Sequence, residues 1–357
     1  MDERVASLSI EIPDQPGHEP TVLPGGRPRL FFFVECEGVA LLELLAPPML
    51  ELLAQQGYGI ALALPQFDET NAAAIRRLNH AAIPVVAWLI PPTTDEVGFS
   101  LTNYPRATAC YRAFRAWVQA AELQIMAVGI EIEPPLETDE WNTWRLMRVF
   151  LRRLWLARDN ALYPAARAAY LDLIATIRHD GYEVHTYQIP LIADDRLAGT
   201  TLVQRALDIV DLPADVEVLF CSSQMPIDWL ADDLGGALIA AYGEVADAIA
   251  IGSGPGGHDG MPLGWPSLRR DLLLAAQHTD TIYLTTLEEL DKHGMLMQIV
   301  TLDWSAHARP APRRRLMTEV LRTMLFGVLL GARLGWRALA WAGWLCAFVL
   351  WLRQRRT

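Results

Sequence analysis

Two carboxylates, Glu131 and Glu133, lie at the end of the apolar run that starts at Met126, and a proline pair follows them directly. Acids at this spacing suit general acid–base chemistry, in which one carboxyl group is held protonated and the other stays ionised. Burial would raise the pKa of one member, because like charges repel and apolar surroundings disfavour the ionised form. We therefore take Glu133 as the candidate general acid and Glu131 as its catalytic partner.

A β-strand must position these acids. Side chains alternate along a strand, so the two acids share one face with Gly129, and the β-branched residues between them point the other way. This pattern fits a parallel barrel in which the acids face the lumen and helices cover the outside. Pro134 donates no backbone hydrogen bond, so we expect the strand to end there, with Glu133 at the C-terminal rim where such barrels keep their chemistry.

Further segments of strand character alternate with helical patterns along the whole chain. The eight predicted strands are Leu30–Glu37, Tyr58–Pro65, Ile83–Ile90, the run ending at Glu133, Gly181–Ile189, Val216–Cys221, Ala248–Ile251 and Thr281–Thr286. Eight β-then-α units favour a (βα)8 TIM barrel over an open doubly wound sheet. We assign residues 1–28 to an irregular N-terminal arm, 29–308 to the barrel and 309–357 to a basic, apolar tail.

Polar residues near the ends of the other strands complete the candidate site, because the carboxyl ends of parallel strands meet at one rim. The candidate substrate-binding residues are Glu35, Glu37, Gln66, Asp68, Tyr187, Gln188, Gln224 and Glu288. Glu35 and Glu37 repeat the spacing of the two catalytic candidates. We expect them to share one site with Glu133 across the lumen.

The stretch from Gly129 to Glu133 resembles the strand-four motif of family 18 chitinases, in which acids alternate into the lumen and the last glutamate is the acid. Glu133 matches that glutamate, Glu131 replaces the preceding aspartate, and Gly129 stands where the first lumen aspartate belongs. Ile132-Glu133-Pro134 is also similar to the Asn-Glu-Pro ending of strand four in the large retaining glycosidase clan. The resemblance implies a glycoside-hydrolase-like barrel that acts on or binds a carbohydrate.

Two other functions stay open. One is a non-catalytic carbohydrate-binding or scaffold barrel at a membrane, which a closed rim with Glu133 locked to an arginine would favour. The other is a metal-dependent sugar isomerase or lyase, which an ion between Glu35, Glu131 and His185 would favour. The chain has no HxH or HExxH pattern, and its GSGPGGHDG loop lacks the lysine of a phosphate-binding loop. We therefore expect neither a metal nor another cofactor.

Charge is distributed unevenly over the 357 residues. The net charge is −12, but residues 309–357 hold ten arginines and one acid, Glu319, so the tail carries +9 and the rest −21. An acidic body argues against nucleic acid as the main partner. A basic tail that contains the uncharged, tryptophan-rich stretch Ala338–Leu352 favours association with a membrane.

For the tail we predict a hydrophobic helical hairpin with helices near 316–333 and 337–352. Arginines at the two ends of this hairpin outnumber those at its turn, which predicts that the barrel lies on the cytoplasmic face of the membrane. Glu319 and Arg322 are one turn apart and are expected to pair within the first helix. Alternatively, that helix lies flat in the membrane interface and leaves Ala338–Leu352 as one short span.

Overall fold

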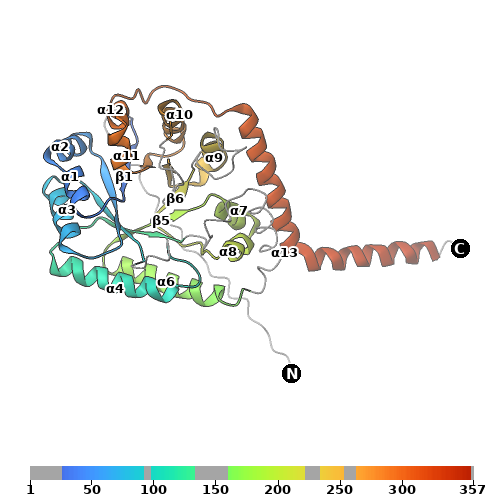
Figure 1. The fold of residues 1–357 in the computed structure, drawn as a ribbon. Helices are drawn as coiled ribbons and strands as arrows, with labels where there is room; N and C mark the ends of the chain where they lie inside the picture. The colour runs from blue at the N-terminus through green and yellow to red at the C-terminus, as the bar shows by residue number, and fades with distance from the viewer. Residues whose placement is uncertain (1–25, 92–97, 133–159, 222–233, 253–262, 355–357) are drawn as a thin grey trace.

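Eight parallel strands form a closed barrel in the computed structural model, which describes residues 26–91, 98–132, 160–221, 234–252 and 263–354 (Figure 1). The strands pair in chain order, and β1 pairs with β8 to close the barrel. They are β1 (Arg29–Val34), β2 (Gly59–Leu64), β3 (Val85–Leu89), β4 (Ala127–Glu131), β5 (Glu183–Gln188), β6 (Val216–Phe220), β7 (Ala248–Ile251) and β8 (Thr281–Leu284). The predicted (βα)8 barrel is confirmed.

Helices surround the barrel and cover the outer faces of its strands (Figure 1). They are α1 (Gly38–Leu44), α2 (Pro47–Gln56), α3 (Glu69–His80), α4 (Tyr104–Ala120), α6 (Tyr163–His179), α7 (Leu191–Ala198), α8 (Leu202–Leu207), α9 (Leu234–Tyr242), η3 (Gly243–Val245), α10 (Trp265–Ala275), α11 (Leu287–Lys292), α12 (Met295–Val300) and α13 (Pro312–Gln354). After β8 the chain forms two short helices, α11 and α12, because Gly294 adopts a left-handed conformation between them.

Signals in the sequence fix several helix ends. Pro47 begins α2, where a missing N–H costs nothing, and Gly57 ends it with a φ of 66°, a conformation that glycine adopts readily. Asp68 precedes α3, and its side chain accepts a hydrogen bond from the Asn71 N–H at 2.8 Å. Asp68 follows β2, so this helix end lies at the C-terminal rim of the barrel, whereas Gly57 precedes β2 at the opposite end.

Alternation along β4 follows the predicted pattern in the described residues. Val128, Ile130 and Ile132 are buried in the large apolar layer between strands and helices, whereas Ala127 belongs to a separate cluster inside the lumen. Gly129 faces the same side as Ala127, since the Tyr187 ring of the lumen lies directly over it. Glu131, two residues further on, therefore also lies on the lumen side.

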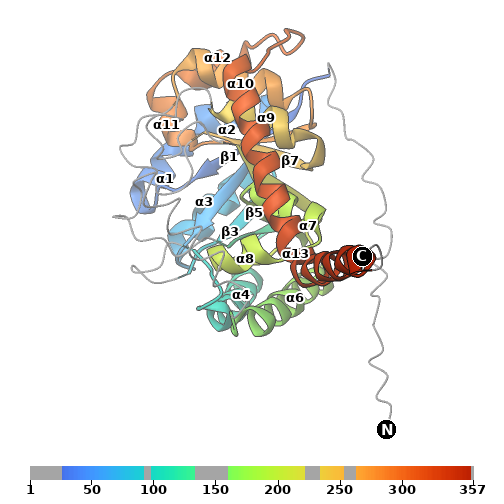
Figure 2. The same ribbon diagram turned by 90° about the vertical axis from the view of Figure 1, so that its right-hand side faces the viewer.

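The C-terminal segment differs from the predicted hairpin. One helix, α13, continues through the residues expected to form the turn, and it bends along its length without folding back into a hairpin (Figure 1, Figure 2). The physical reason is that this turn contains no proline, and its one glycine, Gly335, costs a helix only about 1 kcal/mol. The first part of α13 packs along α9 and α7, and its C-terminal part extends away from the barrel (Figure 1, Figure 2).

Ion pairs in α13 also differ from those expected. Glu319 does not pair with Arg322; it accepts a hydrogen bond from Arg315 at 2.8 Å on the helix surface. Arg322 instead reaches the barrel shell, where its Nε lies 2.7 Å from the buried carboxylate of Asp194 in α7. Within the described part of the chain, no single helix combines the length and hydropathy needed to cross a membrane, although the bent pair α1–α2 together satisfies both by length and composition.

Candidate functional site

Glu131 ends β4 and is 7% exposed. It pairs in register with Tyr187 of β5, so the two side chains are neighbours on the lumen side of the rim. Burial raises the pKa of Tyr187 well above its usual value, and the charges of Tyr283 and Glu131 raise it further. Glu131 therefore lies beside a tyrosine that stays protonated and can act only as a neutral hydrogen-bond donor or acceptor.

Aromatic rings fill the lumen next to Glu131. The Phe33 ring lies 5.2 Å from both the Trp88 ring and the Tyr187 ring, and 5.5 Å from the Tyr283 ring. Phe220, which is partly buried, joins this cluster at 6.1 Å from Phe33. The lumen is consequently a packed apolar interior, and its rings form a floor below the rim.

Gly129 makes room for this floor. A Cβ at this position would lie 2.8 Å from both Cε2 and Oη of Tyr187. Any side chain here would push the tyrosine out of the packed lumen. The space that the first lumen aspartate of the chitinase motif would fill is therefore taken by the Tyr187 ring.

Glu288, at the start of α11, joins the last strand to the first. Its Oε1 accepts hydrogen bonds from the backbone N–H groups of Glu35 and Cys36, both at 3.0 Å. Its Oε2 is buried and has no hydrogen-bond partner among the described residues. Burial raises the pKa of Glu288, although the backbone hydrogen bonds partly offset this effect. The Glu288 carboxyl group thus holds the loop after β1 at the rim through Oε1 alone.

The remaining candidates on the first two strands are more exposed. Glu35 is half-buried, whereas Glu37 is exposed and precedes α1 without capping it by its side chain. Gln66 is exposed, and its backbone carbonyl accepts a hydrogen bond from the Asn71 side chain at 2.9 Å. Asp68 is the N-cap of α3 described above. Of this group, Glu35 is the member whose backbone N–H is held by the Glu288 carboxylate.

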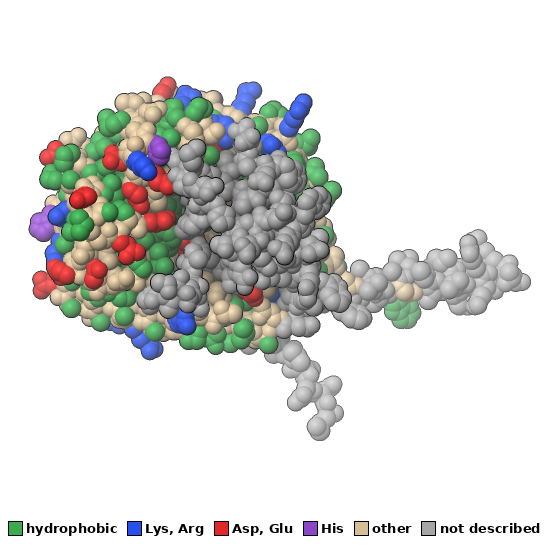
Figure 3. Space-filling model, in the orientation of Figure 1, with side chains coloured by type: hydrophobic (Ala, Val, Ile, Leu, Met, Phe, Trp, Pro, Cys, Tyr) green, Lys and Arg blue, Asp and Glu red, His purple; other side chains and the backbone are tan. Residues whose placement is uncertain are grey.

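The rim around β1, β2 and β8 is acidic. Asp and Glu side chains gather on the face over α1, α3 and α11 (Figure 3). In the described segments that follow the strands and precede the next helix, there is no lysine or arginine. The carboxylates of these described segments repel negatively charged groups that approach this part of the rim.

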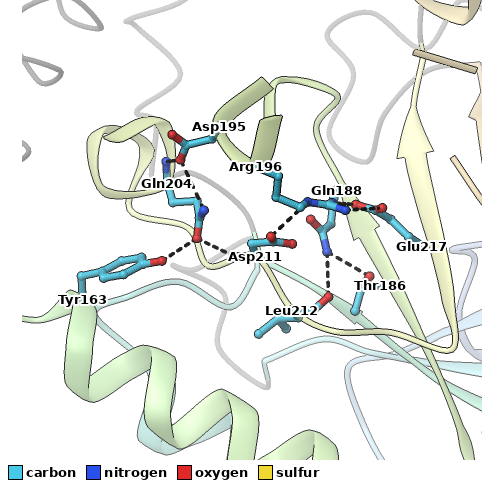
Figure 4. A network of polar contacts seen from close by, with 9 residues as sticks. All are labelled: Tyr163, Thr186, Gln188, Asp195, Arg196, Gln204, Asp211, Leu212 and Glu217. Carbon is cyan, nitrogen blue, oxygen red and sulfur yellow. Dashed lines mark hydrogen bonds and ion pairs between the residues drawn. The ribbon is translucent and has the colours of Figure 1, made fainter. Parts of the chain in front are cut away.

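Gln188 is not part of this rim. It is the last residue of β5, and its side chain points to the outside of the barrel, where Nε2 donates to Thr186 at 3.0 Å and to the Leu212 carbonyl at 3.4 Å (Figure 4). Tyr187 and Gln188 are consecutive, so they face opposite sides of the sheet. Tyr187 alone reaches the lumen.

Figure 4 shows that Gln188 belongs to a polar network between the barrel and α7–α8. Arg196 donates to both carboxylate oxygens of Glu217 on β6, and its Nε lies 3.0 Å from Asp211. Burial raises the pKa of Asp211 and of Glu217, and the nearby Arg196 only partly offsets this. In the same network, Gln204 accepts from the Tyr163 hydroxyl at 2.6 Å. These contacts hold helices against strands and offer no opening to a ligand.

His185 lies one step below the rim on β5. Its Nδ1 is 2.5 Å from the Tyr283 hydroxyl, and its Nε2 faces Glu183 at 3.5 Å. Glu183 is at the opposite, N-terminal mouth of the lumen, so His185 points away from Glu131 and does not share a site with it. Across the described ranges, no group of three or more His, Cys, Asp or Glu residues is placed to hold a metal ion.

Two predicted site residues lie outside the described residues. They are the candidate acid Glu133 and the candidate ligand contact Gln224. The retaining glycosidase clan, which the stretch Ile132-Glu133-Pro134 resembles, has a second glutamate at the end of strand seven, and in this chain Gly252 follows β7 instead. Its φ is 119°, and a Cβ would lie 2.3 Å from Cβ of Thr285, so no glutamate fits there.

The chain matches no sequence-family profile and no curated protein. Two solved structures align with most of it: a ligand-free tryptophan synthase from M. tuberculosis and the YdjI aldolase from Escherichia coli K12. The first has 13% identity and a TM-score of 0.34, covering 78% of this chain and 90% of that one. The second has 10% identity and a TM-score of 0.34, covering 86% and 90%. At these values neither structure bears on activity.

Phe33 and Tyr283 of the aromatic floor are not among the residues predicted from the sequence. Both have the same alternation as Glu131, each on the lumen face of its strand. That period of two was the available signal. It was overlooked because continuous apolar strands such as Leu30–Val34 do not show which face is the lumen.

Proposed function

We propose that the C-terminal rim is a catalytic site of the glycoside-hydrolase type, acting on a neutral carbohydrate, with Glu131 in the site and Glu133 as general acid. The observation that carries this proposal is the position of Glu131: it is buried, on the lumen side at the end of β4, and next to a floor of aromatic rings. Glycoside hydrolysis requires a protonated carboxyl group and a second group that stabilises positive charge at the sugar ring.

The surroundings of Glu131 support a sugar over other substrates. The C–H faces of a sugar ring pack on aromatic rings, while its hydroxyl groups need acceptors such as the rim carboxylates. The acidic rim and the lack of described lysines or arginines in its loops argue against phosphorylated ligands. The assignment of Glu133 as general acid comes from the sequence, where Glu133 lies two residues after Glu131 and directly before Pro134.

The test compares hydrolysis of a panel of aryl glycosides by the parent chain with that by Glu131→Gln and Glu133→Gln. We expect each substitution to lower kcat/KM by roughly 100-fold or more, as when a positioned acid or base is removed. Glu183→Gln is the matched control. It also removes a carboxylate from a lumen strand, but at the N-terminal mouth, and should leave the rate unchanged.

Two outcomes would contradict the proposal. If all variants hydrolyse the panel at the parent rate, the rim acids are not catalytic. If no aryl glycoside is turned over but oligosaccharides bind to the parent and not to Glu131→Gln, the barrel is a carbohydrate-binding module without catalysis. Binding is measured by calorimetry on the same protein samples.

A further inference from the structure

The first part of α13 carries an apolar face that nothing in the described structure covers. Its members follow one another at intervals of three or four residues, which places them on one side of a helix. They are Leu316, Val320, Met324, Gly327, Gly331 and Leu334, here called the outer face. The apolar side chains among them are exposed, with Leu316 at 62% and Met324 at 63%. The outer face spans about 27 Å of helix.

The opposite side of α13 fixes its orientation on the barrel. Arg322 reaches the buried carboxylate of Asp194, donates to the Ala241 carbonyl, and lies 4.3 Å from the centre of the Tyr242 ring. The Tyr242 hydroxyl donates to the same carboxylate at 2.5 Å. A buried ion pair with these extra partners sets the rotation of a helix, because turning it would leave Asp194 charged and unpaired.

Further along, the docked side repeats this arrangement. Arg333 donates to the carbonyl of Ala198 at the end of α7, at 2.9 Å. Leu329, one turn before Arg333 in α13, is fully buried. The helix therefore turns its charged anchors inwards and its apolar residues outwards. A soluble surface rarely leaves a continuous apolar strip of this length uncovered, so the outer face is suited to a partner.

The distribution of charge along α13 indicates which partner the outer face fits. Arg313 is exposed and lies at the start of the outer face, and Glu319, the one acid in residues 309–357, pairs with Arg315. The same helix continues into Ala338–Leu352, which contains no charged residue, and reaches Arg353. Basic ends and an apolar strip match the surface of an anionic membrane, which attracts the arginines and accepts the apolar side chains.

We propose that the outer face of α13 lies in the interface of an anionic lipid bilayer and holds the barrel against it. The proposal concerns the described residues from Leu316 to Leu334 and does not depend on the activity of the rim. A second copy of the chain is the competing occupant, because Gly327 and Gly331 would permit close approach of another helix.

The first experiment is flotation of the full-length chain with vesicles of phosphatidylglycerol and phosphatidylcholine, compared with pure phosphatidylcholine. We expect binding to the anionic vesicles that weakens as salt is raised. Leu316→Glu/Val320→Glu/Met324→Glu should reduce the bound fraction about 10-fold. The control Val39→Glu/Leu162→Glu/Met297→Glu places the same three charges on exposed apolar positions of other elements and should bind as the parent does.

A second experiment locates the contact without adding charge. An environment-sensitive fluorophore is attached at Met324→Cys or at Met297→Cys, in a chain whose Cys36 and Cys346 are replaced by alanine. Both methionines are more than half exposed, but only Met324 is on the outer face. Anionic vesicles should shift the emission to the blue at position 324 and not at 297.

Two results would overturn the proposal. Flotation without a blue shift at 324 would mean that another segment, such as Ala338–Leu352, binds the membrane alone. Self-association that is lost in the Leu316→Glu/Val320→Glu/Met324→Glu variant, without vesicle binding by the parent, would assign the outer face to a second copy.

Discussion

The two faces of β5 and β6 differ in character: the packed lumen face is usual for a barrel of this class, and polar side chains on the outer face are not. Their lumen face is close-packed with rings, such as Tyr187 beside Phe33, whereas their outer face, under α7, carries the polar side chains of Gln188 and Glu217. In most such barrels the layer between strands and helices is a continuous apolar core.

The difference shows that different physical effects stabilise the two regions. Rings in the lumen gain dispersion contacts and lose them if a gap opens. The outer network depends on charge, and Arg196, whose side chain is 42% exposed, still contacts water. Three changes should distinguish these regions, and the lumen is expected to be the more sensitive.

The largest effect is expected for Phe33→Ala. Phe33 contacts Trp88, Tyr187, Phe220 and Tyr283, so the substitution leaves a cavity in a rigid cluster. We expect the free energy of unfolding, measured with denaturant, to fall by about 3–5 kcal/mol. Phe33→Leu, which keeps most of the volume, should lose less. Equal losses for the two variants would show that the lumen is not tightly packed.

A smaller loss is expected for Arg196→Met. The change leaves the mostly buried carboxylates of Glu217 and Asp211 without their shared cation. Breaking a buried pair costs about 3–5 kcal/mol, and the partial exposure of Arg196 reduces this to about 2–3 kcal/mol. The control is Arg178→Met, because Arg178 and its partner Asp215 are both more than a third exposed. If both substitutions lower the free energy of unfolding by the same amount, burial does not strengthen the ion pairs of the outer network.

The smallest effect is the pH dependence of the same network. Burial raises the pKa values of Asp211 and Glu217 in the folded chain, so the folded state binds protons more tightly than the unfolded state. Their contribution to stability is therefore full below the ordinary carboxyl pKa and is lost as pH rises through the raised values. Tm should increase as pH is lowered from about 7 to about 5. Glu217→Gln cannot titrate, so a slope as steep as that of the parent would contradict this account.

The sequence predicts the barrel well because each strand is a short apolar run that lies next to a helix signal, such as Gly57 before β2 or Asp68 after it. It also predicts the side of β4 on which Glu131 lies, because acids and β-branched residues alternate there. It cannot decide between Tyr187 and Gln188, since adjacent polar residues at a strand end give no sign of which faces the lumen. Nor does it reveal that Arg322 is bonded to Asp194, because that contact joins residues 128 positions apart.

The closure of the barrel by β1 and β8 has a kinetic consequence. The seam pairs Arg29 with Thr281, and the Glu288 carboxylate binds the N–H groups of Glu35 and Cys36, which are 253 and 252 positions away in the chain. Contacts so distant in sequence form slowly, because a long loop must be ordered before they stabilise anything. Until β8 has been synthesised and docked, β1 keeps an open hydrogen-bonding edge that can pair with another chain. Glu288 is therefore placed to secure the last strand pair to form, and its arrival ends the period in which the nascent barrel is open to aggregation.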